Sequence, residues 1–132
     1  MSASSQPSSS DLRLVVIIAY ALFLIAMVNG ITAVAGVVLA YIKRGDARGT
    51  IYEGHFANMI FVFWASLIAF VLFLAIVLGG VAGALSGWQA PHTWALLTLI
   101  PLLWFAGVAF LVWYLYRTVR GIALAVDGKA YP

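Results

Sequence analysis

One polar stretch interrupts an otherwise apolar chain: Lys43-Arg44-Gly45-Asp46-Ala47-Arg48-Gly49-Thr50-Ile51-Tyr52-Glu53-Gly54-His55. It holds five of the eleven formally charged side chains, so every apolar segment can be placed by reference to it. Only 8% of the 132 residues are charged, and 65% are hydrophobic. Because a soluble domain is typically about one quarter charged, these side chains could not cover a wetted surface. The composition therefore predicts an integral membrane protein.

The segment before this stretch, residues 14–42, contains 29 uncharged residues. As a single helix it would be about 43 Å long, against a hydrocarbon core of about 30 Å. Asn29 and Gly30, at its middle, are weak helix formers that are common at turns. Two structures compete: one long tilted or kinked helix, or two short helices over about residues 13–28 and 31–43 folded as a hairpin. We favour a broken segment that makes one net crossing, preceded by a disordered polar tail at residues 1–12.

Two further segments are long enough to span a membrane. Residues 56–78 predict one helix of 23 residues, and residues 94–116 predict another that contains Pro101. A loop with four glycines and no charge, residues 79–91, separates them. The expected fold is therefore an all-α polytopic membrane bundle with three or four membrane segments. Its transmembrane domain covers residues 13–121, and residues 122–132 form a C-terminal tail.

Small and polar residues gather on one face of the helix predicted at residues 56–78. This stripe, at steps of three and four, consists of His55, Asn58, Val62, Ser66 and Ala69. Lipid offers the Asn58 amide no partner, so the stripe should face neighbouring helices. A four-residue spacing of small residues in the first segment favours close packing within the fold over a homodimer face. These residues are Thr32, Gly36 and Ala40.

Basic residues are distributed on one side of the predicted membrane segments. Residues 43–55 and 117–132 each contain three Lys or Arg, whereas residues 79–93 contain none. Because short loops rich in Lys and Arg stay cytoplasmic, both basic segments and the C-terminus are predicted to be cytoplasmic. The net charge of +3 is too small to indicate a nucleic-acid partner, but it suits anionic lipid head groups.

Few residues are candidates for chemistry. Thr50 and Glu53 match a capping box, in which each side chain bonds the other's exposed backbone N–H. His55 and His92 are predicted at opposite ends of the spanning helices, about 30 Å apart, so they cannot share a metal or haem. The apolar segments contain no Asp, Glu, Lys, Arg or His, which argues against a pump or coupled transporter. We expect no enzymatic activity, no cofactor and no metal site.

Two motifs stand at the ends of the predicted helices. The first reads Tyr41-Ile42-x-Arg44, then Ala47-Arg48-Gly49-Thr50-x-x-Glu53-x-His55-Phe56 and Phe63-Trp64. The second reads Tyr116-Arg117-Thr118-Val119-Arg120-Gly121 and Asp127-Gly128-Lys129-Ala130-Tyr131-Pro132. Over about residues 14–132 the chain resembles a bacterial family of small Tic20-like membrane proteins of unknown function. The resemblance implies a helical bundle in the bacterial inner membrane with both motifs on the cytoplasmic face.

Two functions are compatible with this pattern. The favoured one is a non-enzymatic accessory or scaffold subunit, in which residues 43–55 and 116–132 dock another membrane protein, a second copy or anionic lipid. The candidate docking residues are Lys43, Arg44, Arg48, Glu53, His55, Arg117 and Arg120. The alternative is a pore, permease or translocon-type component for a small neutral solute or a polypeptide. Its lining residues, which are otherwise helix-packing residues, would be Asn29, Thr32, Gly36, Asn58, Ser66 and Thr98.

Overall fold

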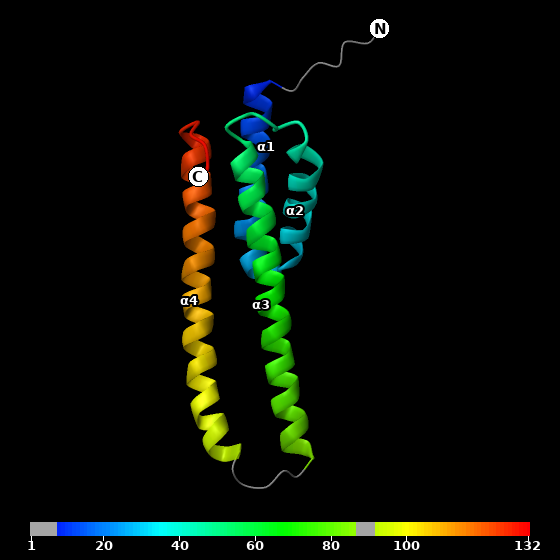
Figure 1. Cartoon of the computed structure of the whole chain (residues 1–132), viewed down its shortest axis with the longest axis vertical. Helices are drawn as coiled ribbons and strands as arrows, with labels where there is room; N and C mark the ends of the chain where they lie inside the picture. Colours follow the sequence, from blue (N-terminus) through cyan, green and yellow to red (C-terminus); the bar gives the residue numbers. More distant parts are fainter. Residues whose placement is uncertain (1–7, 87–91) are drawn as a thin grey trace. The chain divides into compact units, whose positions relative to one another are not determined.

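The computed structural model describes residues 8–86 and 92–132, apart from the side chains of residues 84 and 92–97. The regular elements in these ranges are four helices: α1 (Ser9–Asn29), α2 (Ile31–Arg44), α3 (Glu53–Leu85) and α4 (His92–Val126) (Figure 1). Among them, α1, α3 and α4 are long and apolar enough to cross a membrane. These findings confirm the predicted all-α integral membrane fold.

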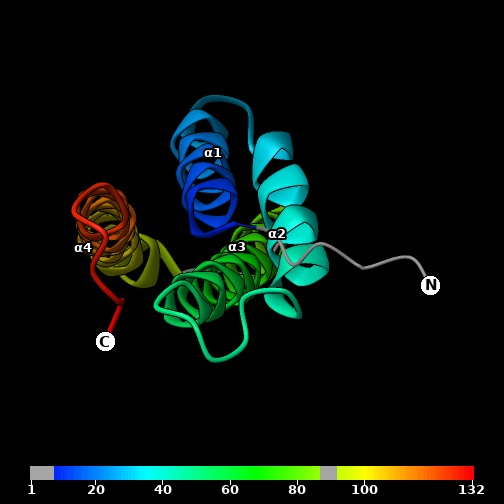
Figure 2. The ribbon, with the colours of Figure 1, turned by 90° about the horizontal axis from the view of Figure 1, so that it is seen from above.

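The first apolar segment breaks at the predicted place. Gly30 separates α1 from α2 with a φ of 69°, in the left-handed region that glycine adopts readily. The Thr32 hydroxyl donates to the carbonyl of Leu22 at 2.9 Å, and the Asn29 side chain accepts from the Thr32 amide at 3.2 Å. The two helices then run antiparallel and side by side, as both ribbon views show (Figures 1 and 2).

A close approach at Gly36 holds the two helices together. A Cβ atom at this position would lie 2.8 Å from the ring of Phe23, so only glycine fits. The hairpin brings the end of α2 back toward the start of α1, and α2 has 14 residues, about 21 Å. The structure therefore replaces the favoured single net crossing with a helical hairpin, the other reading of this segment.

Helix α1 begins earlier than expected. It starts at Ser9, within the stretch of residues 1–12 for which disorder was predicted. A capping box explains the start, since the Ser8 hydroxyl accepts from the Asp11 amide at 3.3 Å and the Asp11 carboxylate accepts from the Ser8 amide at 3.2 Å. The backbone N–H groups of Ser8 and Asp11 are both bonded in this way, which explains why a helix begins in this serine-rich sequence.

Helices α3 and α4 are also longer than the predicted 56–78 and 94–116. Helix α3 continues to Leu85 through Gly79, Gly80 and Gly83, where a loop was expected. A helix satisfies its own backbone polar groups, which matters more in an apolar medium than the low helix propensity of glycine. Residues 87–91 of the predicted loop lie outside the described residues. Helix α4 contains Pro101, as expected, and runs on to Val126 before the tail at residues 127–132.

The chain divides into two units. The charged unit comprises residues 1–64 and 115–132, and the apolar unit is Ala65–Tyr114. All eleven formally charged side chains belong to the charged unit. Its core includes large side chains that are at most 2% exposed: Val16, Tyr20, Phe23, Phe56, Met59 and Val62.

The apolar unit has a different surface. Its described side chains are mostly exposed, and the large ones are hydrophobic, such as Phe70, Leu72 and Leu102. Aromatic rings pair along α4, where Phe110 lies 5.4 Å from Trp113 between ring centroids. A surface of this kind is suited to lipid chains rather than to water.

Candidate functional site

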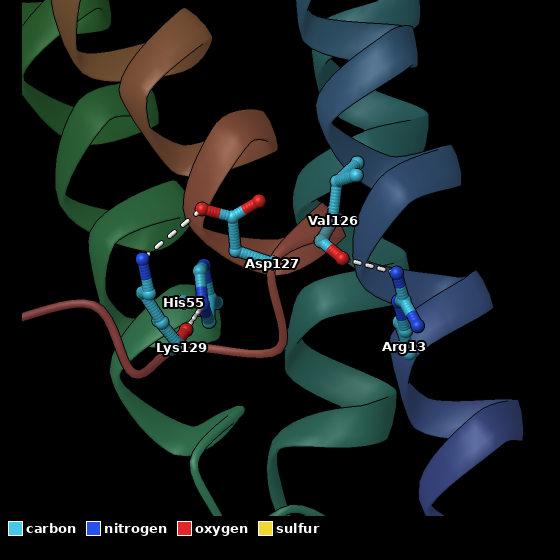
Figure 3. Close-up of polar contacts among 5 residues, drawn as sticks. All are labelled: Arg13, His55, Val126, Asp127 and Lys129. Carbon is cyan, nitrogen blue, oxygen red and sulfur yellow. Dashed lines mark hydrogen bonds and ion pairs between the residues drawn. The ribbon is translucent and has the colours of Figure 1, made fainter.

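A buried polar cluster lies in the charged unit, around His55 near the start of α3. His55 is fully buried, and Asn58 on the next turn is 4% exposed. The Nε2 atom of His55 lies 2.9 Å from the backbone carbonyl of Lys129, in the C-terminal tail (Figure 3). On the other side of the ring, Nδ1 lies 3.5 Å from the hydroxyl of Tyr20 on α1. His55 therefore connects α1, α3 and the C-terminal tail.

The hydrogen-bond partners define which atoms donate in this cluster. A carbonyl only accepts, so His55 carries its proton on Nε2 and donates to the Lys129 carbonyl. Its Nδ1 then accepts from the Tyr20 hydroxyl, which itself accepts from the Asn58 amide nitrogen at 3.0 Å. The result is one continuous chain of donors, from Asn58 through Tyr20 and His55 to the tail. The side-chain oxygen of Asn58 is buried without a hydrogen-bond partner in the described part of the chain.

Two glycines make this cluster sterically feasible. A Cβ atom at Gly121 of α4 would lie 2.6 Å from Cε1 of Tyr20, so the Tyr20 ring passes directly over the α4 backbone. A Cβ atom at Gly54 would collide with the backbone carbonyl of Tyr131. Larger residues at either position would push the tyrosine ring or the tail away from His55.

The C-terminal tail is held over His55 by aromatic and cationic contacts. The Tyr131 ring meets the His55 ring edge-on, with 5.8 Å between centroids. Arg117 of α4 donates from Nε to the Tyr131 hydroxyl at 3.2 Å and lies 4.8 Å from the centroid of the Phe61 ring. Such cation–π contacts contribute roughly 0.5–1 kcal/mol at exposed sites. The tail residues 127–132 are therefore part of the folded unit.

The loop between α2 and α3 is arranged differently from the predicted capping box. The Thr50 hydroxyl accepts from the Tyr52 amide at 3.2 Å and donates to the Ala47 carbonyl at 2.7 Å. The Glu53 carboxylate accepts from the Gly49 amide at 2.9 Å. In place of the two reciprocal capping-box bonds, the Thr50 hydroxyl bonds the backbone of Ala47 and Tyr52, and the Glu53 carboxylate bonds the backbone of Gly49. Gly49, at a φ of 75°, turns the chain so that its amide faces the carboxylate.

All seven predicted docking residues belong to the charged unit, and all but one are at least partly exposed. The exception is His55, which is fully buried and therefore cannot belong to an exposed docking surface. Arg44, Arg48, Glu53 and Arg120 are exposed. Partly exposed members are Lys43, which pairs with Asp46 at 3.0 Å, and Arg117.

The predicted packing or pore-lining residues fall into two groups. Four lie in the charged unit and make contacts there: Asn29, Thr32, Gly36 and Asn58. The other two belong to the apolar unit, where Ser66 is partly buried and Thr98 is exposed.

Sequence reasoning missed Tyr20, Gly121 and Tyr131, which complete the His55 cluster. One signal for Tyr20 exists, because it is the only polar residue in positions 14–28. A hydroxyl in such a run requires a partner inside the protein. No local pattern, however, links position 20 with positions 55 and 131.

Comparisons with models of protein families, with curated proteins and with solved structures found no match.

Proposed function

We propose that this protein is a non-enzymatic accessory subunit, which docks a membrane protein partner or anionic lipid head groups through the exposed charged residues of segments 43–55 and 116–132. The proposal rests on one observation: two segments that are distant in the sequence contact each other in the structure. Residues 43–55 and 116–132 come together through the His55–Lys129 bond and the Tyr131 contacts. Two basic segments that are separate in the sequence thereby form one folded end, suitable for recognition by one partner.

The lysines and arginines of these two segments differ in whether they form ion pairs. Lys43 pairs with Asp46, and Lys129 pairs with Asp127 at 3.2 Å. Within the described ranges, Arg44 and Arg48 are exposed and have no ion-pair partner. Two free guanidinium groups beside apolar helices attract anions, since each contributes about 1 kcal/mol near an anionic membrane surface. They are the residues on which docking should depend most.

The proposal includes membership of the Tic20-like family and a place in the bacterial inner membrane, with the charged end in the cytoplasm. Both motifs of the resemblance lie in the charged unit. The excess of Lys and Arg at this end supports the cytoplasmic assignment.

The pore reading receives less support from the structure. Thr32 and Asn29 bond within the hairpin turn, Gly36 packs against Phe23, and Asn58 donates to Tyr20. Four of the six residues that would line a pore are thus engaged in packing. This favours the docking function.

Site-specific photo-crosslinking in native membranes tests the proposal. A photoreactive residue at Arg48 should give one discrete protein adduct, or anionic-lipid adducts if the partner is the membrane surface. The same residue at Phe70, a 57% exposed position of the apolar unit, serves as the lipid-facing control. The adduct should weaken at least severalfold when Arg44 is changed to Gln, but not with Lys129→Gln, since Lys129 already pairs with Asp127. Identical adducts at Arg48 and Phe70, unchanged by Arg44→Gln, would refute the proposal.

A further inference from the structure

An open groove of about 480 Å³ lies in the charged unit, and neither Arg44 nor Arg48 lines it. Its walls come from three parts of the chain. The first three turns of α1 contribute Ser9, Ser10, Arg13, Leu14 and Ile17, the loop contributes Tyr52, and the end of α4 contributes Val126. Its volume is within the range of about 300–1,000 Å³ that is common for small-molecule sites.

The groove changes from polar to apolar along α1. Ser10 and Arg13 line it near the helix start, and Leu14 and Ile17 line it immediately below. At about 1.5 Å per residue, Ile17 lies about 6 Å further along the helix axis than Arg13. Leu14 is also the first residue of the long apolar run. The groove therefore spans the level at which a membrane changes from head groups to hydrocarbon.

The charge of the groove comes from Arg13. Its Nη2 atom donates to the carbonyl of Val126, the last residue of α4 (Figure 3). This contact uses one of the five guanidinium donors and leaves the others available. Arg13 is exposed and has no carboxylate partner among the described residues.

Nearby carboxylates are engaged elsewhere. Asp11 accepts from the Ser8 amide, and Asp127 pairs with Lys129. Neither carboxylate lines the groove, and Arg13 is the one charged side chain among its lining residues.

We propose that this groove binds a single anionic phospholipid. Arg13 holds the phosphate of the head group, and the beginning of an acyl chain lies along Leu14 and Ile17. The cation selects an anionic over a zwitterionic head group, and the apolar wall selects a lipid over a soluble phosphate. None of the groove residues is among the charged residues proposed for docking, so this site is independent of the proposed function.

Native mass spectrometry of the delipidated full chain in a neutral detergent tests the site. The probes are phosphatidylglycerol and phosphatidylcholine with the same short acyl chains, each titrated at equal concentration. We expect phosphatidylglycerol to bind at least about fivefold more tightly, consistent with one basic residue near an anionic head group. Arg13→Gln should abolish this preference, and Arg13→Lys should retain most of it.

Two further variants separate the site from general electrostatics and from a folding defect. Ser10→Glu adds a carboxylate to the groove one helical turn before Arg13, where it competes with a lipid phosphate for the guanidinium, and an acidic residue suits the first turn of a helix. It should also abolish the preference. Arg44→Gln removes the same charge from an exposed position outside the groove and should leave the preference unchanged.

Three results would overturn the inference. One is equal binding of the two lipids, and another is an equal loss with Arg44→Gln and Arg13→Gln. The third is competition by glycerol 3-phosphate as effective as that by phosphatidylglycerol, which would indicate a soluble ligand. The adduct at Arg48 should persist in Arg13→Gln, so failure of this site and failure of the proposed docking function remain distinguishable.

Discussion

At the scale of single residues, the most consequential side chain is His55. Its sequence position, beside Glu53 at the start of a helix, predicted a docking residue. The structure buries it completely and uses both ring nitrogens, one for Tyr20 and one for the Lys129 carbonyl. A buried donor or acceptor that loses its partner costs roughly 1–3 kcal/mol. His55 thus has a structural role, which is to fix the tail on α3.

Replacement of His55 by Phe should release the C-terminal tail. Phe fills the same volume but leaves the Lys129 carbonyl and the Tyr20 hydroxyl without their partner, at a cost of about 1–3 kcal/mol. Amide hydrogen exchange at residues 127–131 should become much faster, while exchange in the middle of α3 changes little. His55→Gln retains a donor for the carbonyl and should keep most of the protection. Exchange in His55→Phe as slow as in the unchanged protein would show that the tail is held without this bond.

At the scale of secondary structure, the sequence predicted the elements better than their ends. The break at Gly30 was expected because Asn-Gly disfavours helix, and the two long spans were expected from their length. The glycines of α3 and the polar residues after Tyr116 led to predicted helix ends that were too early. Both helices continue because a helix bonds its own backbone N–H and C=O groups, which outweighs the low helix propensity of these residues. The hairpin itself depends on the Gly36–Phe23 contact, which joins positions on opposite sides of the break. Spacing alone does not reveal such a pairing.

The crossing of α1 and α4 should depend on Gly121. Changing Gly121 to Ala places a methyl group against the Tyr20 ring and should destabilise the protein by about 1–3 kcal/mol through overpacking. The matched control is Gly107→Ala on the same helix, where a Cβ atom meets nothing within 4 Å. Thermal unfolding in mild detergent should therefore show a lower midpoint for Gly121→Ala only. A lowered midpoint for both variants would assign the effect to α4 as a helix rather than to this contact.

At the scale of the whole molecule, the separation of charge is the main feature. Composition predicted a membrane protein, and the positions of the basic residues predicted one charged end, because both follow from counting residues along the chain. The cluster that closes this end could not be predicted. It joins positions 20, 55 and 129, which are far apart in the sequence.

The hairpin predicts that the start of α1, the α2–α3 loop and the tail share one side of the membrane. The chain has no cysteine, so each single cysteine replacement introduces the only thiol that the reagent can label. Cysteines at Ser9, Thr50 and Ala130, all exposed, should react with an impermeant maleimide from the same side of sealed vesicles. A cysteine at Ser86, beyond the end of α3, should react only from the other side. Labelling of the Ser9 and Thr50 positions from opposite sides would contradict the hairpin topology.

The confinement of every charge to the charged unit affects how the chain enters a membrane. In the proposed orientation the segment to be translocated lies between α3 and α4, and residues 79–93 contain no Asp, Glu, Lys or Arg. Moving a charged side chain through the bilayer centre costs at least about 2.5–3.5 kcal/mol, and this segment avoids that barrier altogether. The turn between α1 and α2, residues 28–32, likewise contains no charged side chain. In the proposed orientation, therefore, insertion moves no charged side chain through the bilayer centre.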